Sequence, residues 1–286
     1  VKEMDYEPNL FAAGLRRSES REIGIIVPTL TGFFYDSFIT AVVEEARKQK
    51  YTIVVMLSGD DPEIEQQNIR ICKQRRVDGI MVCVTSQTRD VSYFEKIQNQ
   101  QIPLLFFDKV PDMPASNTVC VADNRAAEIA ASELIKKNKQ SVLSLFADTN
   151  FSITQKRLVS YQQAFQDSGK SDHCMIRYAR SSEEAEQIVL DEVTKNKYDA
   201  VFCMSDEILI GTMKALQCMK SQNTISIISI SNGFFPTLYE PEITYVETSG
   251  RKLGKQAFAR MLQLMQGDTG KQHIEVEAVL IGGGTL

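Results

Sequence analysis

Residues 23–57 read IGIIVPTLTGFFYDSFITAVVEEARKQKYTIVVML, a strand pattern, a helix pattern and a second strand pattern in succession. The runs at 23–27 and 52–57 are rich in Val and Ile, which favours buried strands. Between them, Phe38, Ala41 and Ala46 repeat at helical spacing, which predicts a helix over residues 36–50. A strand, a helix and a strand in this order are typical of a parallel βαβ unit.

The same alternation continues to the end of the chain. Further strands are predicted at 78–84, 104–107, 142–146, 174–178, 200–204, 225–230, 244–246 and 274–281, with helices at 62–76, 91–99, 153–167, 182–196, 206–219 and 249–266. Asp61 as a cap and Pro62 in the first turn mark the start of the helix over 62–76. We therefore expect an α/β fold of two similar lobes, each a doubly wound parallel sheet.

The last segment is too short for a third lobe and is expected to complete the first two. Chain crossings near Asp123, Thr248 and Gly270 would give a three-stranded hinge. We expect a linker at 1–21, an amino-terminal lobe at 22–123 plus 249–270, and a carboxy-terminal lobe at 124–248 plus 271–286. Ligands of open α/β sheets bind beyond the carboxyl ends of the strands, so two facing lobes predict a cleft there.

Composition limits the classes of protein and partner. The 286 residues are 43% hydrophobic and 24% charged, as in ordinary water-soluble proteins. No apolar run approaches the roughly 20 residues that span a bilayer, and the first residues are charged where a secretory leader would be apolar; we expect a cytoplasmic protein. The net charge of −5 predicts that the core repels nucleic acid. DNA contact would therefore be local, near the basic cluster of Arg16, Arg17 and Arg21.

The patterns of catalytic and metal sites are missing from the sequence. The six cysteines have no C-x-x-C spacing and mostly lie in apolar runs, which favours buried reduced thiols over disulfides or a metal site. Neither His173 nor His273 has a ligand or triad pattern around it. Glycine-rich phosphate-binding motifs do not occur. The sequence therefore predicts a protein that is not an enzyme and needs no cofactor or metal.

Several short motifs follow one another in a recognisable order. YEPNLFAAGLRR at 6–17 precedes IGIIVP at 23–28 and PTLTGFFY at 28–35; VDGI lies at 77–80, PLLFFDK at 103–109, VADN at 121–124, AVFCMSDE at 200–207 and PEITYV at 241–246. With these pieces in this order, the chain resembles LacI/GalR-type transcription regulators over essentially its whole length. The resemblance implies a two-lobed, periplasmic-binding-protein-like (type I) fold with the effector held between the lobes.

The resemblance implies effector contacts from both lobes. Phe34 and Tyr35 would form an apolar or stacking wall, or would simply pack at the start of a helix. Asp108 would accept bonds from ligand hydroxyls or couple the lobes, with a loop cap as the alternative. Arg157 stands at the arginine of the family's R-x-x-G-[FY] motif, where its fork of donors suits a polyol or carboxylate. Ser160 replaces the glycine of that motif, and a plain surface arginine is the alternative.

Two further pairs of polar residues complete the implied effector site. Ser205 and Asp206 follow a predicted strand, although Asp206 would also serve as a helix N-cap. The chain has Ser231-Asn232 where the family usually reads D-[DN], so the carboxylate that commonly grips sugar hydroxyls is missing. Ser231 and Asn232 could bond a ligand as neutral groups, or the site could favour an anion. We expect a small polar metabolite, either a carbohydrate or a derivative of one.

The opening segment carries an expectation of its own. Residues 9–15 are too few to form a stable helix alone, because helices under about 12 residues are marginal in water. In the family, two such segments fold together on the DNA minor groove and a leucine wedges into a base step. Leu15 is the matching residue, with Ala12 and Ala13 as small packing partners. A plain linker helix is the alternative.

The sequence thus predicts the effector-sensing, dimerising core of a LacI/GalR-type regulator, with a helix-turn-helix head expected before residue 1. The resemblance implies that ligand binding changes lobe closure and moves the paired segments at 9–15, so that affinity for operator DNA follows by linkage. We expect a homodimer with contacts through the helix at 36–50. The alternative is a solute-binding protein of a transporter or receptor, which shares this fold. A monomer would favour that alternative.

Overall fold

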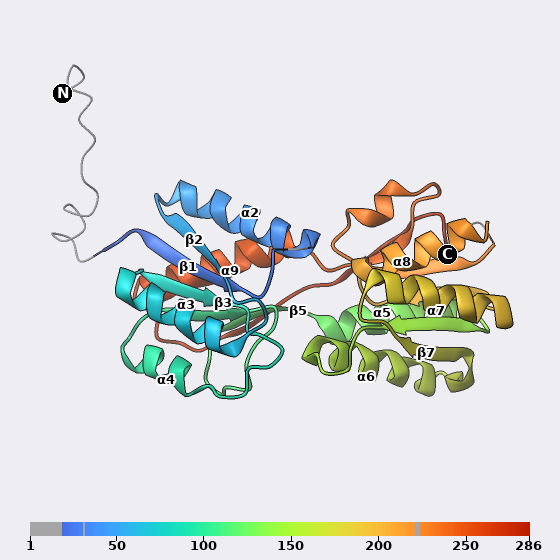
Figure 1. Ribbon diagram of the computed structural model, residues 1–286, viewed down its shortest axis with the longest axis horizontal. Coiled ribbons are helices and arrows are strands. Elements are labelled where there is room, and N and C mark those ends of the chain that lie inside the picture. The colour runs from blue at the N-terminus through green and yellow to red at the C-terminus, as the bar shows by residue number, and fades with distance from the viewer. Residues whose placement is uncertain (1–18, 31, 221–223) are drawn as a thin grey trace, which may run out of the picture. The chain divides into compact units, whose positions relative to one another are not determined.

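The computed structural model describes residues 19–30, 32–220 and 224–286 (Figure 1). These residues form two compact units, each with its own six-stranded sheet. Unit 1 contains the described residues up to 30, Phe38–Val119 and Arg251–Ile274. Unit 2 contains Gly32–Ser37, Cys120–Gly250 and Glu275–Leu286.

The sheet of unit 1 has the order β11-β5-β4-β3-β1-β2. Its strands are β1 (Glu22–Val27), β2 (Thr52–Leu57), β3 (Gly79–Val82), β4 (Leu104–Phe107), β5 (Thr118–Val121) and β11 (His273–Val276). The pairs that join β2, β1, β3, β4 and β5 are parallel. Every residue of β3 and β4 is buried, as expected for parallel strands covered on both faces, and this explains their unbroken apolar sequences.

Four helices cover the sheet of unit 1, namely α2 (Phe33–Lys48), α3 (Pro62–Arg75), α4 (Ser92–Asn99) and α9 (Gly250–Met265). Figure 1 shows α2 and α9 on one side of the strands and α3 and α4 on the other. A Cβ atom on Gly254 would lie 2.5 Å from the Phe38 carbonyl oxygen, so glycine permits the close approach of α9 to α2. The Asp61 carboxylate accepts from Glu63 N at 2.8 Å, which confirms the predicted cap of α3.

The sheet of unit 2 has the order β12-β10-β9-β8-β6-β7. Its strands are β6 (Val142–Phe146), β7 (Cys174–Tyr178), β8 (Ala200–Cys203), β9 (Ser226–Ser231), β10 (Thr244–Glu247) and β12 (Val279–Ile281). The pairs that join β7, β6, β8, β9 and β10 are parallel, and β12 runs antiparallel to β10. The carboxyl ends of β6, β8 and β9 therefore lie at one edge of the sheet.

The helices of unit 2 are α5 (Asp123–Lys136), α6 (Ser152–Asp167), α7 (Ser182–Lys195) and α8 (Asp206–Cys218), with 3-10 turns η1 (Ser171–His173) and η2 (Phe235–Leu238). They pack as two pairs, α5 with α6 and α7 with α8. A Cβ atom on Gly211 of α8 would lie 1.9 Å from the Ser182 carbonyl oxygen of α7, so a larger residue cannot occupy this contact without movement. Helix α8 begins at Asp206, soon after β8 ends at Cys203, so its start lies near the edge where the strands end.

The observed architecture confirms the expected α/β fold of two doubly wound, largely parallel sheets. One element was predicted wrongly. The strand expected at 274–281 is two strands, β11 in the first sheet and β12 in the second, separated by Glu277 and Ala278. No Gly or Pro lies between the two strands, so the sequence does not mark the break. The four-residue strand β5 was not predicted.

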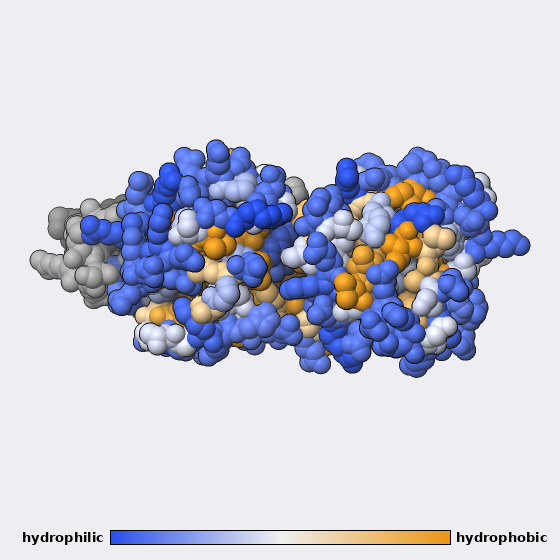
Figure 2. All heavy atoms as spheres, turned by 90° about the horizontal axis from the view of Figure 1, so that it is seen from below, coloured by the Kyte–Doolittle hydropathy of each residue, from blue (hydrophilic) through white to orange (hydrophobic). Residues whose placement is uncertain are grey.

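All six cysteines are free thiols, and four of them are buried. Within residues 19–30, 32–220 and 224–286, no group of three His, Cys, Asp or Glu side chains could hold a metal ion. None of the described helices is both long enough and apolar enough to cross a membrane. Figure 2 shows a face covered mostly by hydrophilic residues, with hydrophobic residues gathered in smaller areas.

Candidate functional site

A polar cluster lies in unit 2 where strands β8 and β9 end. Its members come from four elements that meet at this edge and are Asp123 at the start of α5, Arg157 in α6, Asp206 at the start of α8, and Ser231 and Asn232 at the end of β9. Asp123, Arg157 and Asp206 can carry a charge. Asp123 and Arg157 are buried, and Asp206 is half-buried. We call this group the unit 2 polar cluster.

Arg157 and Asp123 form a buried ion pair within this cluster. Nε and Nη2 of Arg157 lie 2.8 and 2.7 Å from the same carboxylate oxygen, Oδ1 of Asp123. Nη1 donates to the Met204 carbonyl oxygen at 2.6 Å. Arg157 is 8% exposed and Asp123 is 5% exposed. The alternative of a surface arginine is therefore wrong, and the Asp123 carboxylate that neutralises Arg157 was not recognised from the sequence as a site residue.

Asp206 is the second carboxylate of the cluster. It accepts from the Ser231 hydroxyl through Oδ1 and from Asn232 N through Oδ2, the latter at 3.0 Å. Burial raises its pKa, and these two hydrogen bonds and the charge of Arg157 act in the opposite direction. Asp206 is the first residue of α8 and does not cap it. The cap is Ser205, whose hydroxyl accepts from Ile208 N at 3.4 Å, so the cap expected at Asp206 is wrong by one residue.

The structure shows how the cluster is built with serine at position 231. The Ser231 hydroxyl donates to Asp206 and accepts from Gly233 N at 2.9 Å. Asn232 uses both ends of its amide. Oδ1 accepts from Gly250 N at 2.9 Å and Nδ2 donates to the Phe33 carbonyl oxygen at 3.1 Å. Both side chains therefore have protein partners. With serine at position 231, the carboxylate beside the end of β9 is that of Asp206.

The predicted aromatic residues lie at the start of α2. Tyr35 is buried and Phe34 is half-buried, and their ring centroids are 5.7 Å apart in an edge-on arrangement. The neighbouring Phe33, which the sequence analysis did not select, stacks on Phe234 at 4.6 Å and meets the edge of Phe235 at 4.7 Å. The doubled Phe of the sequence was the available signal for this aromatic cluster.

Asp108 lies in unit 1, directly after β4. Its backbone has a φ of 59°, a left-handed conformation that Asp tolerates better than most residues. Its backbone N–H donates to the Val119 carbonyl oxygen at 3.1 Å, and the Cys83 thiol lies 3.7 Å from Oδ2. The carboxylate thus stands at the carboxyl end of a buried strand.

The residues predicted to contact the DNA minor groove, Leu15, Ala12 and Ala13, lie outside the described residues.

Unit 1 also holds a buried carboxylate that was not predicted from the sequence, Glu65. Glu65 of α3 accepts from Thr85 N at 2.9 Å, Thr88 Oγ1 at 2.8 Å and Tyr93 Oη at 2.5 Å. Burial raises the pKa of Glu65, although these three donors act to lower it. Glu65 lies in a largely polar helix sequence, PEIEQQNIRICKQR, and nothing in that pattern marks it as buried. Its partners tie the loop after β3 to α3 and α4.

Comparison with known proteins identifies the family. The sequence profile described as "Periplasmic binding proteins and sugar binding domain of LacI family" matches residues 20–282. The HTH-type transcriptional repressor PurR of Vibrio campbellii (strain ATCC BAA-1116) is 24% identical over 268 residues, which cover 92% of this chain and 80% of that protein.

Two solved structures have the same fold. A LacI family transcriptional regulator from Enterococcus faecium with bound ribose superposes with a TM-score of 0.82 at 18% identity, covering 92% of this chain and 98% of that one. The Lac repressor dimer bound to operator and the anti-inducer ONPF gives a TM-score of 0.86 at 19% identity, covering 99% of this chain and 87% of that one. The chain therefore belongs to the LacI family, within the group of periplasmic binding proteins and sugar-binding domains that the matching profile describes.

Proposed function

We propose that this chain is the ligand-sensing and dimerising core of a cytoplasmic LacI-type transcription regulator, without catalytic activity, and that its effector is a small polar metabolite, a carbohydrate or a derivative of one. The observation that carries the proposal is the unit 2 polar cluster. It places one buried guanidinium and two carboxylates beyond the ends of parallel strands, where ligands of α/β sheets bind.

The cluster has the chemistry that recognises a polyol. A sugar hydroxyl both donates and accepts, so it is matched by a carboxylate beside a fork of N–H groups. Arg157 directs Nε, Nη1 and one N–H of Nη2 to Asp123 and Met204. A guanidinium has five N–H donors. Two N–H groups of Arg157 therefore have no partner among the described residues and are available to a ligand. Each Asp206 oxygen already accepts one hydrogen bond and keeps a second lone pair that can accept from a ligand hydroxyl.

The comparisons supply independent support for a sugar-like ligand. The matching profile is described as a sugar-binding domain, and the Enterococcus faecium structure contains ribose. The other predicted contacts stay predictions, and they are Phe34, Tyr35, Asp108, Ser205, Ser231 and Asn232. Ser205, Ser231 and Asn232 already bond to protein groups, so we expect them to shape the site more than to hold the ligand.

The experiment is a thermal-shift screen of monosaccharides, disaccharides, sugar acids, sugar phosphates and nucleosides, followed by calorimetry on any ligand that raises the melting temperature. We expect a hit whose affinity falls about tenfold or more in Asp206→Asn, because a charged hydrogen-bond acceptor is lost. The matched control is Asp191→Asn, which removes an exposed carboxylate from α7 of the same unit.

Two results would contradict this assignment. One is a panel in which no sugar or sugar derivative binds. The other is a ligand whose affinity is the same in wild type, Asp206→Asn and Arg157→Lys while circular dichroism shows that both variants are folded. Either outcome would remove the unit 2 polar cluster from consideration as the effector site.

Dimerisation and operator binding form the second part of the proposal. We expect a homodimer in analytical ultracentrifugation, with contacts through α2, and a monomer would favour the solute-binding alternative. In a protein that includes its DNA-reading part, Leu15→Ala should weaken operator binding and leave effector affinity unchanged, because the resemblance places this leucine in the minor groove beside Ala12 and Ala13. Unchanged operator binding would rule out that role for Leu15.

A further inference from the structure

Unit 1 contains a pocket at the edge of its sheet where the strands begin. Its volume is about 770 Å³, within the range of about 300–1,000 Å³ that small-molecule sites occupy. Residues just before four strands line it, Glu19, Asp78, Pro103 and Asn117. The last turns of α3, α4 and α9, with the loop after α9, supply the other walls. We call it the unit 1 edge pocket.

The acceptor groups of this pocket are already used by the protein. Asp78 Oδ1 accepts from Ser20 N at 2.8 Å, and Asp78 Oδ2 accepts from Arg21 N at 2.9 Å. Glu19 pairs with the Arg21 guanidinium at 2.9 Å. Asp268 accepts from Gly270 N at 2.7 Å through Oδ1 and pairs with Arg260 through Oδ2. The carboxylates therefore hold the walls in place and have charged or backbone partners of their own.

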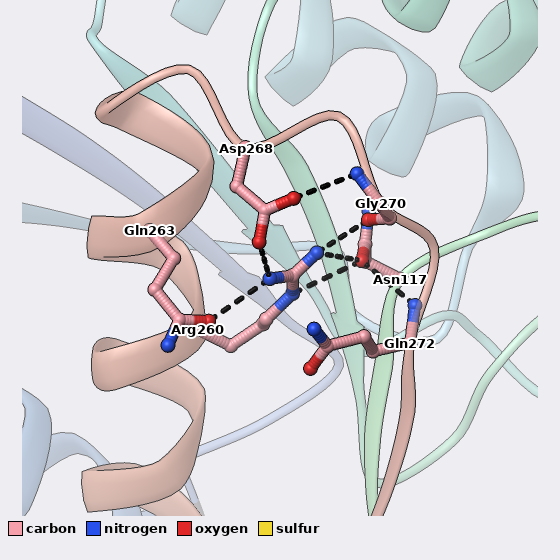
Figure 3. Close-up of polar contacts among 6 residues, drawn as sticks. All are labelled: Asn117, Arg260, Gln263, Asp268, Gly270 and Gln272. Carbon is pink, nitrogen blue, oxygen red and sulfur yellow. Dashed lines mark hydrogen bonds and ion pairs between the residues drawn. The ribbon is translucent and has the colours of Figure 1, made fainter.

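Arg260 organises one wall of the pocket, as Figure 3 shows. This side chain is 1% exposed. It donates to Asn117 Oδ1 from Nε at 3.1 Å and from Nη2 at 2.8 Å, and to Asp268 Oδ2 from Nη1 at 2.6 Å. It also donates to the Gly270 carbonyl oxygen and to Gln263 Oε1. The loop after α9 is thus fixed to the start of β5, and the wall exists without a ligand.

The groups left over are donors. Lys73, Arg76 and Lys271 line the pocket, and their side chains have no hydrogen-bond or ion-pair partner among residues 19–30, 32–220 and 224–286. Gln98 lines it too, and Gln98 Nε2 is buried with no hydrogen-bond partner. A ligand rich in anionic oxygens would give the three cations the partners that they lack among these residues.

The remaining lining suits the carbon skeleton of such a ligand. Ile102, Pro103, Leu264 and Met265 contribute apolar surface, and Tyr51 contributes an aromatic ring. Small-molecule sites combine apolar walls with a few converging polar groups in this way. We infer that the unit 1 edge pocket binds a small phosphorylated metabolite, as a second ligand site that is independent of the unit 2 polar cluster.

The test is calorimetric titration of the intact chain with glucose 6-phosphate and with AMP, with glucose and adenosine as the matched uncharged probes, at about 0.15 M salt to screen non-specific attraction. We expect at least one phosphorylated probe to bind and its uncharged partner to bind more weakly. The double variant Lys73→Gln/Lys271→Gln should lower that affinity about tenfold or more, because two charge-assisted contacts are lost. The control Lys197→Gln removes an exposed lysine from unit 2 and should leave it unchanged.

Asp206→Asn separates this pocket from the proposed effector site. Phosphate-dependent binding should persist in that variant, and its loss there would overturn the inference by moving the ligand to unit 2. Failure of both phosphorylated probes to bind would also overturn it. A final arm uses a random-sequence DNA duplex. If only the duplex binds, and the double lysine variant weakens that binding, the surface recognises a DNA backbone and the metabolite assignment is wrong.

Discussion

Arg157 binds a single carboxylate oxygen of Asp123 through two nitrogens, because Nε and Nη2 both lie within 2.8 Å of Asp123 Oδ1. Both residues are more than nine-tenths buried, and they join α6 to the start of α5. The pair therefore has two consequences. It stabilises the edge of unit 2 on which the polar cluster stands, and it fixes the direction in which the guanidinium presents its remaining donors.

Removing one member of this pair should destabilise unit 2 strongly. Arg157→Met leaves the Asp123 carboxylate buried without a partner, and we expect a loss of about 3 to 5 kcal/mol in the free energy of unfolding. The double variant Arg157→Met/Asp123→Leu removes both charges and should be more stable than Arg157→Met alone. Urea unfolding of the wild type, both single variants and the double variant measures the coupling. Additive effects would mean that the pair is not coupled.

The buried Glu65 should make stability depend on pH. The pKa of Glu65 in the folded protein lies above its ordinary value of 4.5. The stabilisation that protonated Glu65 gives to the fold is therefore fully present below about pH 4.5 and is lost as the pH rises through the folded pKa. Glu65→Gln cannot ionise, so its stability relative to wild type should increase as the pH rises from about 4.5 through the folded pKa of Glu65, by about 1.4 kcal/mol for each pH unit that separates the folded and unfolded pKa values.

Denaturant unfolding at several pH values measures this difference for Glu65→Gln. The control Glu63→Gln removes an exposed carboxylate two residues earlier on the same helix, and so corrects for the loss of one negative charge from α3. A stability difference between Glu65→Gln and wild type that stays constant over the whole pH range would contradict the expected role of burial at Glu65.

The contact between α7 and α8 should tolerate only glycine at position 211. The Cβ of Gly211→Ala would lie 1.9 Å from the Ser182 carbonyl oxygen and 2.9 Å from Ala185 Cβ, and backbone cannot yield as a flexible side chain can. We expect a loss of about 1 to 3 kcal/mol, the usual result of overpacking. Gly282→Ala is the control, since a Cβ there meets nothing within 4 Å. Equal thermal stability of the two variants would show that α8 moves freely.

Lysine at position 260 should not preserve the stability of unit 1. One ammonium cannot reach Asn117 Oδ1, Asp268 Oδ2 and the Gly270 carbonyl oxygen together, so Arg260→Lys should destabilise unit 1 by about 3 kcal/mol. Arg70→Lys on the exposed face of α3 is the matched control and should stay within about 0.5 kcal/mol of wild type. The measurement is urea unfolding followed by circular dichroism. A wild-type midpoint for Arg260→Lys would mean that lysine satisfies the same groups.

The fold was predictable because each buried strand has its own local signal. Residues 52–57, 104–107, 142–146 and 174–178 were assigned as strands with the bounds that the structure shows, since each is a short, mostly apolar run. The exceptions are short or lie at the chain crossings. β5 lies directly before the crossing at Asp123, and the stretch from Ile274 to Ile281 contains no Gly or Pro to mark the change of sheet at Glu277 and Ala278. Such changes depend on tertiary contacts that the local sequence does not encode.

The candidate site was predictable only in part. Motif position selected Arg157, Asp206 and Ser231, and the structure brings them into one cluster. Asp123 was visible only as a motif residue, because nothing local shows that its carboxylate meets an arginine 34 positions later. Glu65 and Arg260 were missed for the same reason. A buried charged residue is recognised by its partners, and those partners are distant in sequence.

The crossing from β11 to β12 determines the order in which the protein can be completed during synthesis. Unit 1 needs α9 and β11, which follow nearly the whole of unit 2 in the sequence. On the ribosome, the first sheet therefore lacks its edge strand β11, and α2 is not covered by α9, until residues 250–276 emerge. Unit 1 begins first, yet it is complete only at Ile274, shortly before unit 2 ends at Leu286. The side of α2 that contains Phe38 must be kept from other apolar partners throughout that interval.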